Sequence, residues 1–157
     1  MITPDRIDFE IMGLLQNDGR LANKQLARQI GLAPSSCLTR VRRLIDTGAI
    51  RGFHADINPS ALGIGLQALL AVRLERHHRE DVDSFITYAT TLPEVVSVMH
   101  IAGPTDVLVH VAVRDGNHLR DLAMDAFTTR PEVARFETSL LYNHQTKAMV
   151  SLHNQAD

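Results

Sequence analysis

The chain has 157 residues, of which 45% are hydrophobic, and a formal net charge of −2 at pH 7. This length and composition allow one ordinary domain or two small ones, each with an apolar core. The single cysteine, Cys37, excludes an internal disulfide framework, and no apolar run approaches the roughly 20 residues that a membrane-spanning helix needs. The first residues also lack a charged segment followed by a long apolar run. We therefore expect a cytoplasmic protein with no membrane partner.

The charge is unevenly distributed along the chain. Between residues 20 and 51 there are seven Lys or Arg side chains and one acid, Asp46, which gives a local net charge of +6. The residues beyond 56 carry eight basic and twelve acidic side chains. A concentrated cationic stretch in an otherwise acidic protein is typical of a phosphate-binding surface.

An amphipathic helix is predicted directly after the segment TPDR. Thr3 can act as the N-cap, and Pro4 suits the first helical position because its φ is fixed and it has no N–H. The residues at 17–19, Asn-Asp-Gly, have the turn chemistry that ends a helix. Between these ends, apolar residues recur at helical spacing and predict one apolar face: Ile7, Ile11, Leu14 and Leu15.

Two further helices follow. The first is predicted over about 23–30, with Gly31 as a left-handed C-terminal cap, and Pro34 opens the second, which runs to Thr47 and ends at Gly48. The helix that begins at Pro34 has an apolar stripe formed by Cys37, Val41, Leu44 and Ile45. Three helices of this size, with a tight glycine turn between the last two, predict a helix-turn-helix.

The periodicity changes after this unit. Residues 49–57 alternate as a strand, and residues 58–63 have the turn residues of a hinge, so we place the domain boundary there. Further strands are predicted at 66–74, 95–102, 106–113 and 134–142. Two amphipathic helices are marked by Val82, Phe85, Ile86, Ala89 and Leu92, and by Leu119, Leu122, Ala123, Ala126 and Phe127. The order βαββαβ is that of the ferredoxin-like fold, an antiparallel four-stranded sheet with both helices on one face.

The expected fold class is therefore α+β with two domains. A (winged) helix-turn-helix domain occupies residues 1–50, a short strand and hinge linker residues 51–63, and a ferredoxin-like domain residues 64–157. The strand at 106–113 is apolar on both faces, because Leu108 and Ala112 alternate with four valines. The helices cover only one face, so the other needs a partner, and the simplest is the same face of a second copy related by a two-fold axis. We expect an obligate homodimer.

The polar face of the helix at 34–47 can lie in a DNA major groove. Its side chains can donate to base edges and phosphates, and the Arg fork suits guanine O6 and N7: these residues are Ser35, Ser36, Thr39, Arg40 and Arg43. Contacts to the DNA backbone are expected from Lys24, Arg28, Arg42 and Arg51. Any amphipathic surface helix has such a face, but the three-helix context, the glycine turn and the local charge of +6 favour DNA binding.

Motifs along almost the whole chain occur in a specific order and spacing. They lie in DRIDFEIMGLLQNDGRLANKQLARQIGLAPSSCLTRVRRLIDTGAIRGFHADINPSALG and in the later AGPTD. In this the chain resembles the Lrp/AsnC (feast/famine) family of bacterial and archaeal transcriptional regulators. The resemblance implies that the helix from Pro34 binds double-stranded DNA and that the residues named above match the family's reading positions. It also implies an amino-acid effector bound in the C-terminal domain at dimer–dimer contacts, and homodimers that assemble further, to an octamer or another ring of dimers.

Two positions depart from the family pattern. Ala22 and Ala33 stand at the expected caps of the second and third helices, where family members usually carry Ser or Thr. An alanine cap leaves backbone N–H groups without partners and typically costs about 0.5–2 kcal/mol. Either Asn23 and Ser35 take over as caps, or the unit is less stable alone and depends on dimerisation.

The segment HIAGPTDV at 100–107 is the candidate effector site. Gly103, Pro104, Thr105 and Asp106 form a good hairpin turn with proline at its second position, and that role alone explains them. A functional role is also open, in which Gly103 lets a ligand approach the backbone and Asp106 meets a charged end of an amino acid. His100 either lines the pocket or is an interface histidine. The resemblance adds Thr138 and Ser139 on the last strand.

Other function classes are less well supported. An RNA-binding βαββαβ domain needs aromatic side chains on its central strands, and the segments at 95–102 and 106–113 have none. A dimeric ferredoxin-like enzyme, of the type that decarboxylates haem precursors, is the alternative, but no nucleophile, base and orienting group can be seen together. Eight histidines show no metal-ligand spacing. We expect no catalytic residues, no metal and no cofactor.

Overall fold

The computed structural model describes residues 3–76 and 78–147. It contains two compact units. The first holds the residues up to Asp56 together with the described residues from Gln145, and the second is Ile57–His144. The division after Asp56 falls inside the linker that was predicted at 51–63. No helix among the described residues is long and apolar enough to cross a membrane.

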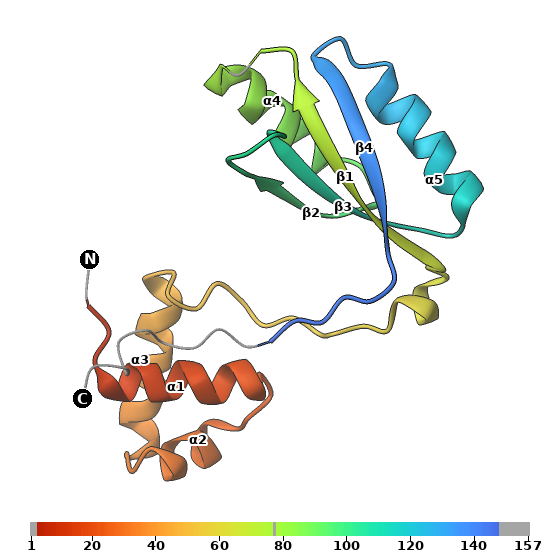
Figure 1. The fold of residues 1–157 in the computed structure, drawn as a ribbon. Helices are drawn as coiled ribbons and strands as arrows, with labels where there is room; N and C mark the ends of the chain where they lie inside the picture. The colour runs from red at the N-terminus through yellow and green to blue at the C-terminus, as the bar shows by residue number, and fades with distance from the viewer. Residues whose placement is uncertain (1–2, 77, 148–157) are drawn as a thin grey trace. The chain divides into compact units, whose positions relative to one another are not determined.

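The first unit is the predicted bundle of three helices. α1 (Arg6–Asn17), α2 (Asn23–Gln29) and α3 (Pro34–Asp46) follow one another in the chain (Figure 1). They bury a small apolar core: Ile11, Leu26, Ala27, Cys37 and Leu44. Gly31 and Gly48 adopt φ of 68° and 74° after α2 and α3, so both glycine stops are confirmed. Ile45, which was predicted for the apolar stripe, is 44% exposed.

The start of α1 differs from the prediction, because Asp5 and not Thr3 is the N-cap. The Asp5 carboxylate accepts a hydrogen bond from the Asp8 N–H at 2.9 Å, and the Asp8 carboxylate accepts one from the Asp5 N–H at 3.0 Å. This reciprocal capping box satisfies two backbone donors, whereas a Thr3 cap would satisfy only one. The helix consequently begins two residues after Pro4.

The structure confirms that alanines stand at the N-caps of the second and third helices. Ala22 and Ala33 are the N-caps of α2 and α3, and neither makes a side-chain cap hydrogen bond. Asn23 and Ser35 do not take over, since both lie inside their helices. The Asn23 side chain instead donates to the Pro34 carbonyl at 2.8 Å and so connects the start of α2 to the start of α3.

The predicted strand at 49–57 is wrong. No described residue from 51 to 58 is in a helix or strand, and all of them are exposed. An alternating segment becomes a strand only when a neighbouring strand pairs with its backbone, and no strand within residues 3–76 and 78–147 pairs with this segment. The hinge chemistry does appear beyond it: a 3-10 helix η1 (Pro59–Leu62) is capped by the Asn58 side chain and ends at Gly63 with φ of 73°.

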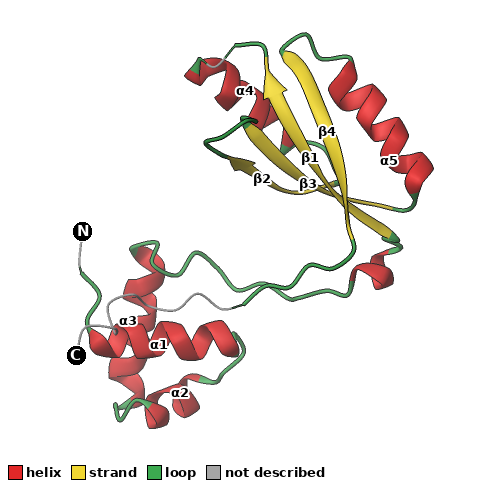
Figure 2. Ribbon diagram, in the orientation of Figure 1, coloured by secondary structure: helices red, strands yellow, loops and turns green. Residues whose placement is uncertain are grey.

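The second unit has the predicted βαββαβ order. Its elements are β1 (Leu66–Leu74), α4 (Arg79–Ala89), β2 (Val95–His100), β3 (Val107–Val113), α5 (Gly116–Leu122), the π-helical turn η2 (Ala123–Thr128) and β4 (Val133–Leu141). The strands form one antiparallel sheet in the order β2-β3-β1-β4 (Figure 2). This is the strand order of a ferredoxin-like fold.

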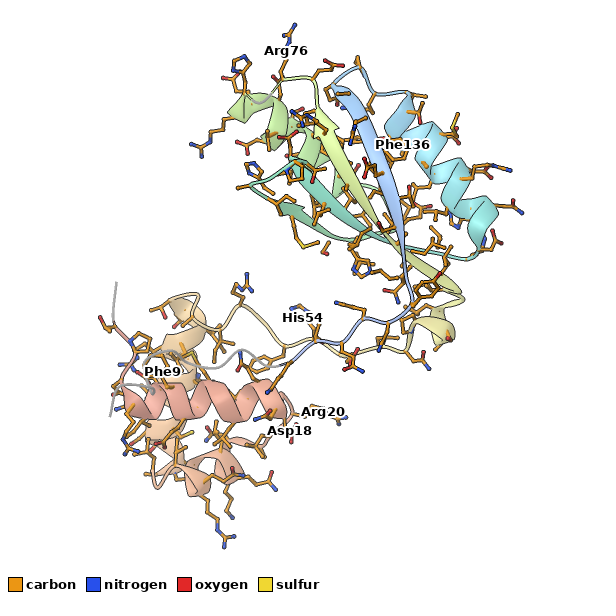
Figure 3. All side chains as sticks on the ribbon, viewed as in Figure 1. Phe9, Asp18, Arg20, His54, Arg76 and Phe136 are labelled. Atoms are coloured by element: carbon orange, nitrogen blue, oxygen red, sulfur yellow. The ribbon has the colours of Figure 1, made fainter. Side chains whose placement is uncertain are left out.

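The two faces of the sheet have different environments. On the helix side, alternate residues of β1 and β3 are at most 1% exposed and pack against α4, α5 and η2: Ala68, Leu70, Val72, Leu74, Val107, Val109, Val111 and Val113. Phe136 of β4, labelled in Figure 3, joins this core with its ring centroid 6.0 Å from that of Phe127.

The other sheet face, here called the open face, includes Gln67, Leu69, Ala71, Met99, Leu108, His110 and Ala112, and the pairing register places Glu137 and Ser139 of β4 on the same face. No helix of the second unit packs on it, and most of its apolar side chains are only half-buried. His110 is the exception at 5% exposed: its Nε2 lies 2.8 Å from Gln67 Oε1, and its ring meets that of His144 edge to face at 5.2 Å. Desolvation, and secondarily the neighbouring His144, lowers the pKa of His110.

Candidate functional site

The exposed face of α3 carries hydroxyl groups near its N-terminal end. Ser35, Ser36 and Thr39 are exposed, and they lie in the first two turns after Pro34. Thr39 Oγ1 donates to the Ser35 carbonyl at 3.0 Å, so this hydroxyl keeps its acceptor capacity. Burial raises the pKa of the Cys37 thiol on the opposite face, which keeps Cys37 a protonated core side chain. The helix thus presents polar groups outward where recognition helices contact bases.

Arg40 and Arg43 have contacts that the sequence did not predict. Arg40 Nη1 lies 2.7 Å from Asp5 Oδ2 and 3.0 Å from Asp8 Oδ1, and Arg43 Nη2 forms an ion pair with Asp8 Oδ2. The hydrogen bond with Asp5 is the main cause of the raised pKa of Arg40, and the same bond lowers the pKa of Asp5. In this structure both guanidiniums bind α1, so a contact with DNA requires exchanging these partners.

The remaining predicted cations are exposed and lack acidic partners within the described chain. Lys24 and Arg28 lie on α2, Arg42 lies on α3, and Arg51 follows α3. Such side chains can move to meet phosphate oxygens without first breaking an ion pair. Arg20 is also exposed beyond α1, where its backbone N–H donates to Asp18 Oδ1 at 2.9 Å; both residues are labelled in Figure 3.

The turn between β2 and β3 is bound to the end of β1. The Asp106 N–H donates to the Val72 carbonyl at 3.0 Å, and Asp106 Oδ2 accepts a hydrogen bond from the Leu74 N–H at 2.8 Å. Arg73 Nη1 donates to the Pro104 carbonyl at 3.0 Å. The Asp106 carboxylate therefore continues the β1–β3 ladder by one hydrogen bond, which is a structural role that the sequence did not indicate.

The predicted effector residues do not all come together in one chain. His100 is exposed at the end of β2, beside the turn that contains Gly103 and Asp106. Thr138 and Ser139 lie on β4, and β3 and β1 separate β4 from β2. Three strand spacings of about 4.8 Å separate β2 from β4 by roughly 14 Å across the sheet.

Sequence reasoning missed two sets of residues. Arg73 is the one charged residue in the strand segment LQALLAVRL, and that departure from an apolar run was a usable signal. The acids Asp5 and Asp8 were counted as charges and as part of the motif that begins DRID, but no ion pair with Arg40 or Arg43 was predicted, although Asp8 is fully buried. Within residues 3–76 and 78–147, no three His, Cys, Asp or Glu side chains are close enough together to hold a metal ion.

Comparison with known proteins agrees with both units. A winged helix-turn-helix DNA-binding family model matches residues 4–51, and the Lrp/AsnC ligand binding domain matches residues 67–149. A helix-turn-helix unit followed by this ligand-binding domain is typical of DNA-binding transcriptional regulators and not of enzymes, and the decarboxylase alternative is not favoured. The chain belongs to the Lrp/AsnC family.

Several relatives are similar over most of their length. The HTH-type transcriptional regulator AldR of Mycolicibacterium smegmatis is 43% identical over 140 residues, which are 89% of this chain and 82% of that protein. The leucine-responsive regulatory protein of Escherichia coli is 35% identical, over 82% of this chain and 79% of that protein. A transcriptional regulator from Neisseria meningitidis, solved in complex with L-methionine, is 29% identical with a TM-score of 0.86, and the match covers 97% of this chain and 98% of that one.

Proposed function

We propose that this chain regulates transcription by placing the N-terminal half of α3 in the major groove of duplex DNA. Ser35, Ser36 and Thr39 then face base edges, and the phosphate contacts come from Lys24, Arg28, Arg42 and Arg51. The observation that carries this proposal is the exposure of these hydroxyls and cations on one helix-turn-helix unit, with no acid paired to any of the four cations in the described chain. In this proposal Arg40 and Arg43 hold the unit together.

In this proposal DNA is bound by pairs of α3 helices, and the open face of the sheet is the surface of a two-fold dimer. Leu69, Ala71 and Leu108 form a half-buried apolar surface on that face, opposite the helices. Burying it against the same surface of a second copy removes apolar area from water at about 25 cal/mol per Å². A dimer presents two recognition helices to half-sites about 34 Å apart, or a multiple of that distance. Assembly of dimers into an octamer or another ring is part of the same proposal.

The effector in this proposal is an amino acid bound at the turn of Gly103–Asp106. The support is the match to the family's ligand-binding domain and the methionine complex of the Neisseria relative. Because Thr138 and Ser139 lie on the opposite edge strand, a neighbouring subunit supplies them if they contact the ligand. Such a shared site couples ligand binding to the packing of dimers, and hence to the number of helix pairs that engage DNA together.

The DNA proposal is tested with a duplex selected from a random-sequence library by the full-length protein, and with a scrambled duplex of equal composition. Fluorescence anisotropy should show that Ser36→Ala with Thr39→Ala weakens binding to the selected duplex alone. Arg42→Ala should weaken binding to both duplexes and reduce the salt slope of binding by about 0.9 per lost phosphate contact. Arg120→Ala on α5 is the matched control and should change neither. The proposal would be refuted if the wild-type protein selected no duplex from the library to which it binds saturably.

The dimer is tested by light scattering on the wild-type chain and two variants. Leu108→Glu on the open face should produce monomers, because it places a charge in the proposed apolar interface. Met124→Glu on the helix layer is the matched control, since Met124 is already 54% exposed, and should leave the mass unchanged. A wild-type chain that is monomeric at micromolar concentration would contradict the proposed interface.

A further inference from the structure

Asp8 is a fully buried acid in the DNA-binding unit. Its side chain is 1% exposed, and its oxygens accept hydrogen bonds from the Asp5 N–H, from Arg40 Nη1 at 3.0 Å and from Arg43 Nη2. The two arginines are 32 and 35 residues away in sequence. One carboxylate of α1 therefore holds two consecutive turns of the recognition helix α3.

The two guanidiniums remain near the surface although they are paired. The side chains of Arg40 and Arg43 are 27% and 35% exposed, while that of Asp8 is buried. Asp5, whose side chain is 51% exposed, adds a second acid to Arg40. Two of the seven cations between residues 20 and 51 are thus neutralised by acids from α1, in a position where their release would add them to the DNA-facing charge.

This arrangement affects specific and non-specific binding differently. Binding to any duplex increases with the number of cations that meet phosphates, and its salt slope is about −0.9 per contact. Base readout depends instead on an accurately placed helix, because side chains must meet base edges within hydrogen-bond distance. A residue that keeps cations away from DNA phosphates weakens non-specific binding. If it also fixes the recognition helix, it strengthens sequence-specific binding.

We propose that Asp8 is a specificity-determining positioning residue, which keeps Arg40 and Arg43 on the protein instead of on DNA phosphates and fixes α3 against α1. The inference rests on the proposed DNA-binding function of α3. Asp8 itself does not contact DNA; it acts through the two arginines. Because the two arginines stay on Asp8, the protein makes two fewer phosphate contacts, and the recognition helix α3 is held in one orientation.

The experiment measures binding of the full-length chain to the selected and the scrambled duplex between 50 and 300 mM KCl, by fluorescence anisotropy. Asp8→Asn should make the salt slope on the scrambled duplex steeper by about 1 per subunit, since Arg43 loses its acidic partner while Asp5 still binds Arg40. It should also lower the ratio of selected to scrambled affinity at least tenfold. Asp5→Asn is the matched control: Asp8 still holds both arginines, so its slope should change by less than half of a phosphate contact.

A second variant keeps the test valid if Asp8→Asn fails to fold, which circular dichroism would show. The triple variant Asp8→Leu, Arg40→Met, Arg43→Met replaces the buried ionic cluster by apolar groups, a change that proteins often tolerate. If Asp8 withholds the arginines, the triple variant keeps the wild-type salt slope on the scrambled duplex and loses part of the preference for the selected one. A slope reduced by one or two contacts, or an unchanged specificity ratio in the Asp8→Asn chain, would overturn the inference. Absence of any duplex binding by the wild type would instead refute the proposed function.

Discussion

Replacing Asp106 by alanine should destabilise the second unit. Leu74 is 1% exposed, and its N–H is bonded to Asp106 Oδ2 at 2.8 Å. A buried donor without a partner costs about 1–3 kcal/mol, so we expect a loss of about 2 kcal/mol in the free energy of unfolding. For a unit of this size, each kcal/mol shifts Tm by roughly 4–8 °C, which predicts a decrease of about 8–16 °C. The assays are thermal denaturation at fixed protein concentration and hydrogen exchange at the Leu74 amide.

Asp106→Asn provides the matched variant for this experiment. It keeps an oxygen that can accept from the Leu74 N–H, and we expect less than half of the alanine effect. The reasoning is refuted if Asp106→Ala lowers Tm by less than about 2 °C while the Leu74 amide stays protected. In that case the Asp106 carboxylate does not complete the strand ladder.

Three further changes test other parts of the structure. Ala33→Ser should supply the missing cap of α3 and raise the stability of the first unit by about 0.5–2 kcal/mol in urea denaturation, and no gain would contradict the cap position. Gly31→Ala should lower that stability by roughly 1–2 kcal/mol through the φ of 68° alone, because an added Cβ meets no atom within 4 Å; an unchanged urea midpoint would exclude the left-handed turn. For His110, whose pKa is lowered in the folded chain, the unfolded chain binds the proton first as pH falls, so stability should decrease from about pH 6.5 down to the folded pKa. His110→Gln should flatten this profile, and a wild-type stability that does not change between pH 7.5 and 5 would refute the assignment.

Most secondary structure was predictable because its causes are local. The apolar spacing in residues 7–15 and the glycines after α2 and α3 predicted the three helices, and the short apolar runs at 66–74 and 106–113 predicted the central strands. The helix starts were less predictable, since Thr3–Pro4 and the Asp5–Asp8 capping box are both plausible signals, and only their competition in three dimensions decides. The strand at 49–57 failed because its pattern was right but no strand among the described residues pairs with it.

The sequence by itself determined the α+β class, the helix-turn-helix, the βαββαβ order and the family, because these follow from periodicity, turn residues and motif order along the chain. Only the tertiary structure decided what the charged side chains do. Arg40 and Arg43 pair with Asp8, and the Asp106 carboxylate bonds the Leu74 amide, across separations of more than 30 residues. A local pattern specifies which face of an element is polar, but the partner of a charge depends on which other element folding brings within about 3 Å of it.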